Sequence, residues 1–241
     1  MRKFGLVGYP LTHSFSRAYF TEIFEREGLD AVYANYPLEK IEDIRSLLSV
    51  SELEGLNVTI PYKESVIPFL DKISEAVKEI GACNCIRIQS GIAHGFNTDV
   101  LGFEQTLERK LLPTHSKALV LGTGGAAKAV WYVLKQRNIP FLKISRTAGE
   151  DQLPYESLTE DMVAAHRLII NTTPLGMYPN VDVCPNIPYE AITPAHYLYD
   201  LIYNPDQTEF LKKGAERGAI TENGRDMLII QANESRKIWD L

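Results

Sequence analysis

The sequence predicts an α/β fold in two domains, the second of which has a doubly wound pattern. Three observations support this prediction. The 241 residues are 45% hydrophobic and 23% charged, which is ordinary globular usage and enough chain for one large domain or two small ones. Short apolar runs alternate with segments of helical periodicity, as in parallel βαβ units. This alternation restarts near residue 117, where an apolar run precedes a glycine cluster.

The first half of the chain alternates between strand-like and helix-like segments. Phe20, Ile23 and Phe24 recur at the spacing of one helix face. The Ser90-Gly91 turn joins two predicted strands as a pair. The predicted strands are residues 4–8, 31–36, 55–59, 83–88 and 92–96. The predicted helices are residues 14–27, 41–48 and 100–111.

The second half repeats the alternation and ends on a helix. Its predicted strands are residues 117–121, 141–145, 167–171 and 197–201. Its predicted helices are residues 126–138 and 225–239. No strand follows the last helix, so we expect this helix to return and pack on the first domain. The expected first domain is therefore residues 1–100 plus 224–241, and the second is residues 101–223.

Charge and cysteine usage exclude several classes of protein. The net charge of −6 is the wrong sign for non-specific nucleic-acid binding, so we expect no nucleic-acid partner. Cys83, Cys85 and Cys184 have neither metal-ligand nor redox spacing, the histidines also lack ligand spacing, and we expect no metal. Three free thiols fit the reducing cytoplasm. No apolar run reaches the length of a membrane span, and a strand near residue 4 leaves no room for a signal peptide. A monomer and a homodimer both remain open.

A glycine-rich turn indicates a dinucleotide site. Gly122, Gly124 and Gly125 follow a predicted strand and open a predicted helix at Ala126. Glycines allow a tight turn and a close approach to a pyrophosphate, which the N–H groups of a helix N-terminus bind. The string has Ala127 where G-x-G-x-x-G has its third glycine, which is a known variant. An ordinary tight turn between strand and helix is the alternative.

The end of the next predicted strand favours NADP over NAD. Domains that bind NAD usually place an acidic residue there to hold the ribose 2′-hydroxyl. Here the strand ends in Ser145-Arg146-Thr147, and the first acid is Glu150. A guanidinium can bind a 2′-phosphate through two hydrogen bonds, and the neighbouring hydroxyls can add more. The alternative is that Arg146 is a solvated surface residue.

Four further strings carry a resemblance to a known family. They are His13-Ser14-Phe15-Ser16, the N-V-T-I-P-Y-K string at residues 57–63, Asn97-Thr98-Asp99, and the N-T-T-P-L-G-M string at residues 171–177. With the glycine turn, they make the chain resemble the shikimate dehydrogenase family over almost its whole length. The resemblance implies a substrate-binding first domain and a Rossmann-like second domain that binds NADP(H). It also implies the reversible reduction of 3-dehydroshikimate to shikimate, a step towards the aromatic amino acids.

The resemblance assigns roles to single residues. It implies that Lys63 and Asp99 are the catalytic acid–base pair. The residues expected to contact the substrate are Ser14, Ser16, Thr59, Asn84, Tyr203 and Gln231. The residues expected to contact the cofactor are Gly122, Gly124, Gly125, Ala126, Ser145, Arg146, Thr147, Thr172 and Asp226. The sequence departs from the family pattern at Cys85, which is usually Thr, at Ser145, which is usually Asn, and at Asp226, which is Gly in many members.

The chemistry explains why these residue types are needed. Reduction of a ketone requires a proton delivered to the oxygen, and a lysine beside a carboxylate can supply it. We expect Lys63 to transfer the proton and Asp99 to orient it, although a close pair titrates as a unit. Gln231 interrupts an otherwise apolar helix face and needs hydrogen-bond partners if it is buried, which a polyhydroxylated substrate would provide.

Simpler interpretations and rival functions stay open at this point. Asp99, Ser14 and Ser16 are also good helix caps, and Gln231 could lie partly exposed at a domain edge. One rival is an NAD-dependent quinate/shikimate dehydrogenase, which Arg146 argues against. The other is a catalytically silent NADP-binding regulator, which the presence of both Lys63 and Asp99 argues against.

Overall fold

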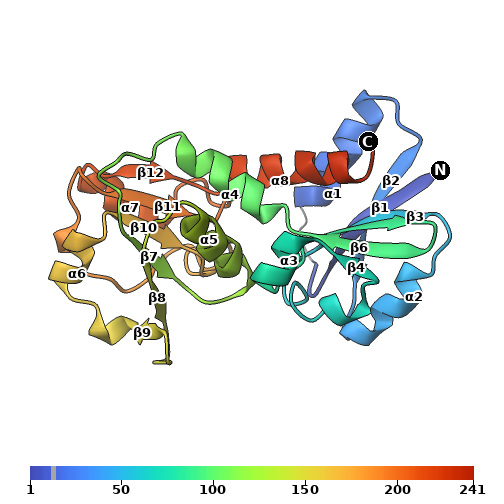
Figure 1. Cartoon of the computed structure of the whole chain (residues 1–241). Helices are drawn as coiled ribbons and strands as arrows, with labels where there is room; N and C mark the ends of the chain where they lie inside the picture. The colour runs from blue at the N-terminus through green and yellow to red at the C-terminus, as the bar shows by residue number, and fades with distance from the viewer. Residues whose placement is uncertain (12–14) are drawn as a thin grey trace. The chain divides into compact units, whose positions relative to one another are not determined.

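The structure is a computed structural model that describes residues 1–11 and 15–241. The chain divides into two compact units (Figure 1). Unit 1 is residues 1–98 together with 232–241, and unit 2 is residues 99–231. The expected boundaries were at residues 100 and 224. The second observed boundary falls inside helix α8 (Arg225–Ile238), a continuous helix that contributes residues to both units, so no loop marks the change.

Among the described residues, unit 1 is built on a mixed sheet of six strands in the order β2-β1-β3-β5-β6-β4 (Figure 1). The β1–β2, β1–β3 and β4–β6 pairs are parallel, and the β3–β5 and β5–β6 pairs are antiparallel. The strands are β1 (Arg2–Gly8), β2 (Ala31–Pro37), β3 (Leu53–Val58), β4 (Lys72–Ile73), β5 (Cys85–Gln89) and β6 (Ile92–Phe96). The helices are α1 (Phe15–Arg26), α2 (Ile44–Leu48) and α3 (Glu75–Ile80), with 3-10 turns at Ile41–Asp43 and Ile67–Phe69.

The two faces of this sheet carry separate apolar clusters. Phe20 of α1 and Trp239, just after α8, pack against Phe4 of β1 on one face. Helices α2 and α3 cover the other face, where they bury Ile44 and Val77. Trp239 is only 2% exposed. The expected return of the last helix to the first unit is therefore confirmed for residues 232–241, while residues 225–231 of α8 belong to unit 2.

Replacing Gly55 by Ala is expected to destabilise unit 1 by about 1–3 kcal/mol, the usual cost of overpacking. A Cβ at Gly55 would lie 2.3 Å from Nε1 of Trp239 and 2.5 Å from its Cδ1. The indole cannot move aside easily, because it is buried and Nε1 donates a hydrogen bond to the Ile86 carbonyl at 2.9 Å. Calorimetry should show a Tm lowered by several degrees.

The matched control for this variant is Gly149→Ala. The three atoms nearest to a Cβ at Gly149 belong to the side chain of Gln152, which is half-buried and lies outside the apolar core, so the Tm should fall less than in Gly55→Ala. Trp239→Phe in the Gly55→Ala background should recover part of the loss, because the smaller ring leaves room for the added methyl group. A Gly55→Ala protein with the wild-type Tm would contradict the packing described above.

Within the described residues, unit 2 is built on a sheet of six parallel strands in the order β12-β11-β10-β7-β8-β9 (Figure 1). The strands are β7 (Ala118–Leu121), β8 (Phe141–Ser145), β9 (Gln152–Pro154), β10 (Leu168–Asn171), β11 (Tyr197–Asp200) and β12 (Ile220–Glu222). The helices are α4 (Asp99–Glu108), α5 (Gly125–Gln136), α6 (Glu160–Ala165), α7 (Glu209–Glu216) and the first part of α8.

Helices cover both faces of this parallel sheet. Phe103 of α4, Val130 of α5 and Met227 of α8 belong to the cluster on one face. Val163 of α6 and Phe210 of α7 belong to the cluster on the other. Parallel strands with helices on both faces define a doubly wound domain, and this prediction is confirmed.

Helices α3, α6 and α7 were not predicted from the sequence. These helices are only six to eight residues long, too short for a clear periodic pattern. Each nevertheless begins after a hydroxyl N-cap that accepts a hydrogen bond from the third helical residue. The three caps are Ser74, Thr159 and Thr208. This cap was the available sequence signal. The missed strands β4, β9 and β12 have two or three residues and no such signal.

The connection from β8 to β9 is unusually short. The two strands pair in parallel, with Ser145 opposite Pro154, but only residues 146–151 join them. A parallel pair usually needs a crossover of about a dozen residues or more, most often a helix. An ion pair between Lys143 and Asp151 closes this loop instead. The segment expected to recognise the 2′-phosphate therefore lies on a short loop between neighbouring strands.

Candidate functional site

The glycine turn lies between β7 and α5 in unit 2. Gly122 has a φ of +106°, in the left-handed region that favours glycine, and a Cβ there would lie 2.6 Å from Oγ1 of Thr172. Gly124 is the N-cap of α5 and provides no side-chain hydrogen bond to the first turn. A Cβ at Gly124 would meet no described atom within 4 Å. The turn thus presents uncapped helix N–H groups beside open space, an arrangement that can bind a phosphate.

The loop after β8 carries the next group of expected cofactor residues. Ser145 ends the strand and is half-buried, while Arg146 and Thr147 are exposed. A hydrogen bond from Lys143 and the charge of Lys143 lower the pKa of Asp151 below its usual value. Both acids of this loop, Glu150 and Asp151, are exposed, and Asp151 is paired with Lys143. The guanidinium of Arg146 remains accessible to an anionic ligand.

Thr172 lies beside the glycine turn, as expected for a cofactor residue. Its hydroxyl donates a hydrogen bond of 2.7 Å to the carbonyl of Leu121, the last residue of β7. Asn171, the last residue of β10, lies in register with Asp200, the last residue of β11, and donates a hydrogen bond to it at 3.1 Å. The sequence analysis assigned no role to this buried pair. A charged residue at the end of an apolar strand was the signal that could have indicated it.

Asp226 is held by a cation of unit 2. It lies in the first turn of α8, and its carboxylate forms an ion pair with Arg109, which follows α4. Both side chains are half exposed. A pairing of this kind at the surface contributes little to stability. The expected contact between Asp226 and the cofactor stays a prediction.

In unit 1, three expected site residues lie on adjoining segments. Thr59 follows β3, and Lys63 belongs to the loop after it. The carbonyl of Lys63 accepts a hydrogen bond of 2.7 Å from the backbone N–H of Cys83, which brings this loop to the segment that holds Asn84. Asn84 is buried, and its side chain bonds Thr98 through both the hydroxyl (3.1 Å) and the backbone N–H (2.7 Å).

A buried polar chain crosses unit 1, and the sequence analysis missed it. Tyr33 donates a hydrogen bond of 2.8 Å to Oδ1 of Asn57, and Nδ2 of Asn57 donates one of 2.8 Å to the hydroxyl of Ser235 on α8. Burial raises the pKa of Tyr33 well above its usual value, and a hydrogen bond from Ser16 partly opposes the shift. Ser16 therefore has a partner within the unit, while Ser14 lies outside the described residues.

The remaining expected site residues belong to unit 2. Asp99 is the first residue of α4 and is 5% exposed, Tyr203 follows β11, and Gln231 lies on α8. Burial raises the pKa of the Tyr203 phenol. The expected acid–base pair is thus divided, with Lys63 in unit 1 and Asp99 in unit 2. Asp99 directly follows Thr98, which Asn84 fixes in unit 1.

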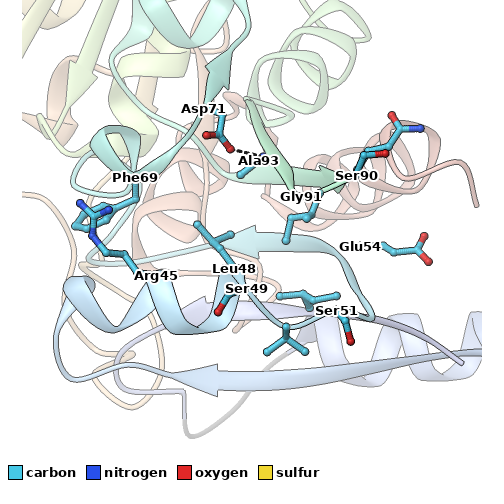
Figure 2. Close-up of a pocket in the computed structure, with 14 residues that line it drawn as sticks. Arg45, Leu48, Ser49, Ser51, Glu54, Phe69, Asp71, Ser90, Gly91 and Ala93 are labelled. Atoms are coloured by element: carbon cyan, nitrogen blue, oxygen red, sulfur yellow. Dashed lines mark hydrogen bonds between the residues drawn. The ribbon is translucent and has the colours of Figure 1, made fainter.

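A cavity of about 700 Å³ in unit 1 contains none of the expected site residues (Figure 2). It lies at the start of β3, lined by Leu53 and Glu54, whereas Thr59 follows the end of that strand. The guanidinium of Arg45 lies over the ring of Phe69 on one wall, 4.8 Å from its centre (Figure 2). The cavity is therefore separate from the expected substrate site.

Residues 1–11 and 15–241 contain no cluster of three or more His, Cys, Asp or Glu side chains that could hold a metal ion. No helix in these ranges is both long and apolar enough to cross a membrane.

The chain is similar in sequence and in structure to several known proteins. A family model described as the shikimate dehydrogenase substrate binding domain matches residues 6–86. A shikimate dehydrogenase (NADP(+)) of Methanosphaera stadtmanae is 33% identical, over 98% of this chain and 90% of that protein. A shikimate 5-dehydrogenase of Thermus thermophilus, solved with NADP(H) and shikimate, is 28% identical and superposes with a TM-score of 0.88, covering 99% of this chain and 93% of that one. A quinate dehydrogenase of Corynebacterium glutamicum, solved with NAD, is 27% identical with a TM-score of 0.86 and the same coverage of both chains.

The doubly wound unit with its glycine turn is that of a dinucleotide-dependent oxidoreductase. The chain belongs to the shikimate dehydrogenase family.

Proposed function

We propose that this protein interconverts 3-dehydroshikimate and shikimate with NADP(H), with Lys63 and Asp99 as the acid–base pair. One observation carries the proposal. Lys63, Thr59 and Asn84 lie on adjoining segments of the unit that matches a substrate-binding domain, while the uncapped glycine turn and Arg146 lie on the doubly wound unit. Relatives named shikimate dehydrogenase (NADP(+)), which match over 98% of this chain, support the same assignment.

The proposed proton chemistry uses one residue to transfer and one to orient. Lys63 donates a proton to the ketone oxygen during reduction, and its neutral form accepts that proton in the reverse direction. Asp99 orients the Lys63 ammonium group through its carboxylate. The hydroxyls of Ser14 and Ser16 bind the substrate carboxylate, and Thr59, Asn84, Tyr203 and Gln231 bind the hydroxyl groups around the ring.

The cofactor residues fit a dinucleotide that carries a 2′-phosphate. The uncapped first turn of α5 binds the pyrophosphate, and the open space over Gly124 lets it approach the backbone. Arg146 binds the 2′-phosphate through its guanidinium, supported by the hydroxyls of Ser145 and Thr147. The bound nicotinamide supplies the hydride chemistry.

A four-way assay tests the proposed function. Purified protein is given shikimate or quinate, each with NADP or NAD, and reduced nicotinamide is followed by its absorbance. We expect turnover with shikimate and NADP, because Arg146 gives the loop after β8 a cation without an acid beside it. Fluorescence titration with NADP alone, which uses Trp131 of unit 2 as a reporter, measures cofactor binding separately.

Each result of this assay has a definite meaning. Faster turnover with NAD or with quinate would replace the proposed specificity by that of a quinate/shikimate dehydrogenase. NADP binding without turnover in any pairing would refute the enzymatic proposal and support a silent NADP-binding regulator.

A further inference from the structure

Asp200 is a buried carboxylate to which the proposed mechanism assigns no role. It ends β11, directly opposite Asn171 at the end of β10, and its exposure is 0%. In a doubly wound domain, ligands bind beyond these carboxyl ends of the strands. Asp200 therefore lies just beneath the edge of the sheet where the cofactor and substrate loops begin.

The carboxylate binds three donors, all of them neutral. Oδ1 accepts hydrogen bonds from the backbone N–H of Ile202 at 3.0 Å and from Nδ2 of Asn171 at 3.1 Å. Oδ2 accepts one from the hydroxyl of Thr208 at 2.6 Å. No ion pair to Asp200 is found within the described ranges. Burial raises the pKa of Asp200 to about 6, although the three hydrogen bonds oppose the shift.

A buried carboxylate without a cation is costly to the folded state. Buried groups whose pKa is displaced in this way are concentrated at functional sites. The contacts of Asp200 identify what its charge could serve. The Ile202 donor lies in the loop that follows β11, and the Asn171 donor ends β10, where the next loop begins.

The two loops carry expected ligand-binding residues. The bond to Ile202 fixes the backbone directly before Tyr203. The bond to Asn171 orients the Asn171 side chain, whose Oδ1 accepts hydrogen bonds from the N–H (3.0 Å) and the hydroxyl (2.7 Å) of Thr173. These bonds fix the turn that holds Thr172 against the start of the glycine turn.

We propose that Asp200 is a positioning residue whose carboxylate sets the places of Thr172 and Tyr203 together. This inference rests on the proposed function, since it takes Thr172 and Tyr203 as ligand-binding residues. The competing explanation is purely structural, because the hydroxyl of Thr208 also caps α7 by accepting a hydrogen bond from the N–H of Leu211.

Asp200→Ala tests the proposal, because it removes the oxygen that the N–H of Ile202 and the amide of Asn171 share. Loss of a charge-assisted hydrogen bond corresponds to about a tenfold change. We expect the KM for shikimate and the Kd for NADP each to rise about tenfold. Steady-state kinetics gives the KM, and tryptophan fluorescence without substrate gives the Kd.

Two further variants separate the loop contacts of Asp200 from its contact with the cap of α7. Thr173→Val removes the hydroxyl that binds Asn171, so we expect a weaker NADP Kd with an almost unchanged shikimate KM. Thr208→Val is the matched structural control. It removes the donor to Oδ2 and the cap of α7, but it leaves both loop contacts of Oδ1. We expect a lower Tm for Thr208→Val, with both ligand constants within about twofold of wild type.

The proposal fails if Asp200→Ala lowers the Tm as Thr208→Val does while both ligand constants stay at wild-type values. If Asp200→Ala does not fold, an unchanged NADP Kd in Thr173→Val overturns the proposal on its own. Failure of the proposed function is a different result. It appears in the wild-type protein as absent shikimate turnover, and the NADP Kd of each variant still reports on the loops.

Discussion

Replacing Lys63 by Ala is expected to lower turnover by about 10²–10⁴-fold, the usual contribution of general acid–base catalysis. The affinity for NADP should change little, because all the expected cofactor residues belong to unit 2 and Lys63 belongs to unit 1. The measurement is kcat with saturating shikimate and NADP, together with the NADP Kd from fluorescence titration.

Two control variants sharpen this test. Lys63→Arg keeps the positive charge but cannot give up a proton near neutral pH, so it should not restore turnover if Lys63 moves a proton. Lys72→Ala removes an exposed lysine of β4 in the same unit and should leave kcat unchanged. Wild-type turnover in Lys63→Ala would remove Lys63 from the mechanism, and full activity in Lys63→Arg would limit its role to electrostatics.

Replacing Arg146 by Ala is expected to raise the KM for NADP by about 10- to 100-fold, the equivalent of a charge-assisted hydrogen bond to the 2′-phosphate. The KM for NAD should barely change, because NAD has no phosphate at that position. Arg146 is exposed on the short loop after β8, so its removal should leave the Tm nearly unchanged. Steady-state kinetics with each nucleotide measures the difference.

Arg167→Ala is the matched control for this variant. Arg167 is also an exposed arginine of unit 2, but it precedes β10 and so lies at the opposite end of the strands from Arg146. Its loss should affect neither KM. If Arg146→Ala and wild type show the same preference between NADP and NAD, the 2′-phosphate must bind to another part of the protein.

The fold could be predicted where periodicity was long or where a turn had a specific chemistry. The strands near residues 4–8, 92–96 and 141–145 were placed within two residues, because each is an apolar run bounded by turn residues. The long helices α5 and α8 were found from their apolar faces. Helices α3, α6 and α7 were missed because one or two turns give no period, although their caps are visible in the sequence.

The candidate site, like the fold, could be predicted only in part. The motif strings predicted Lys63, Asn84 and Thr172 as site residues, because their side chains suit proton transfer or contact with a ligand. The same strings contained Asn57 and Asn171, yet their roles depend on partners far along the chain. Asn57 binds Ser235, which is 178 residues away, and Asn171 binds Asp200, which is 29 residues away. No local pattern specifies such pairs.

The sequence by itself determined the α/β class, the glycine turn and the family, because each depends on local spacing and on the order of short strings. The tertiary structure decided which polar side chains satisfy one another in the interior. Asp200, buried without a cation at the end of β11, is the example with the most consequences. Its hydrogen bonds form only after three separate segments have come together, and a buried carboxylate is tolerated only when all of them are present.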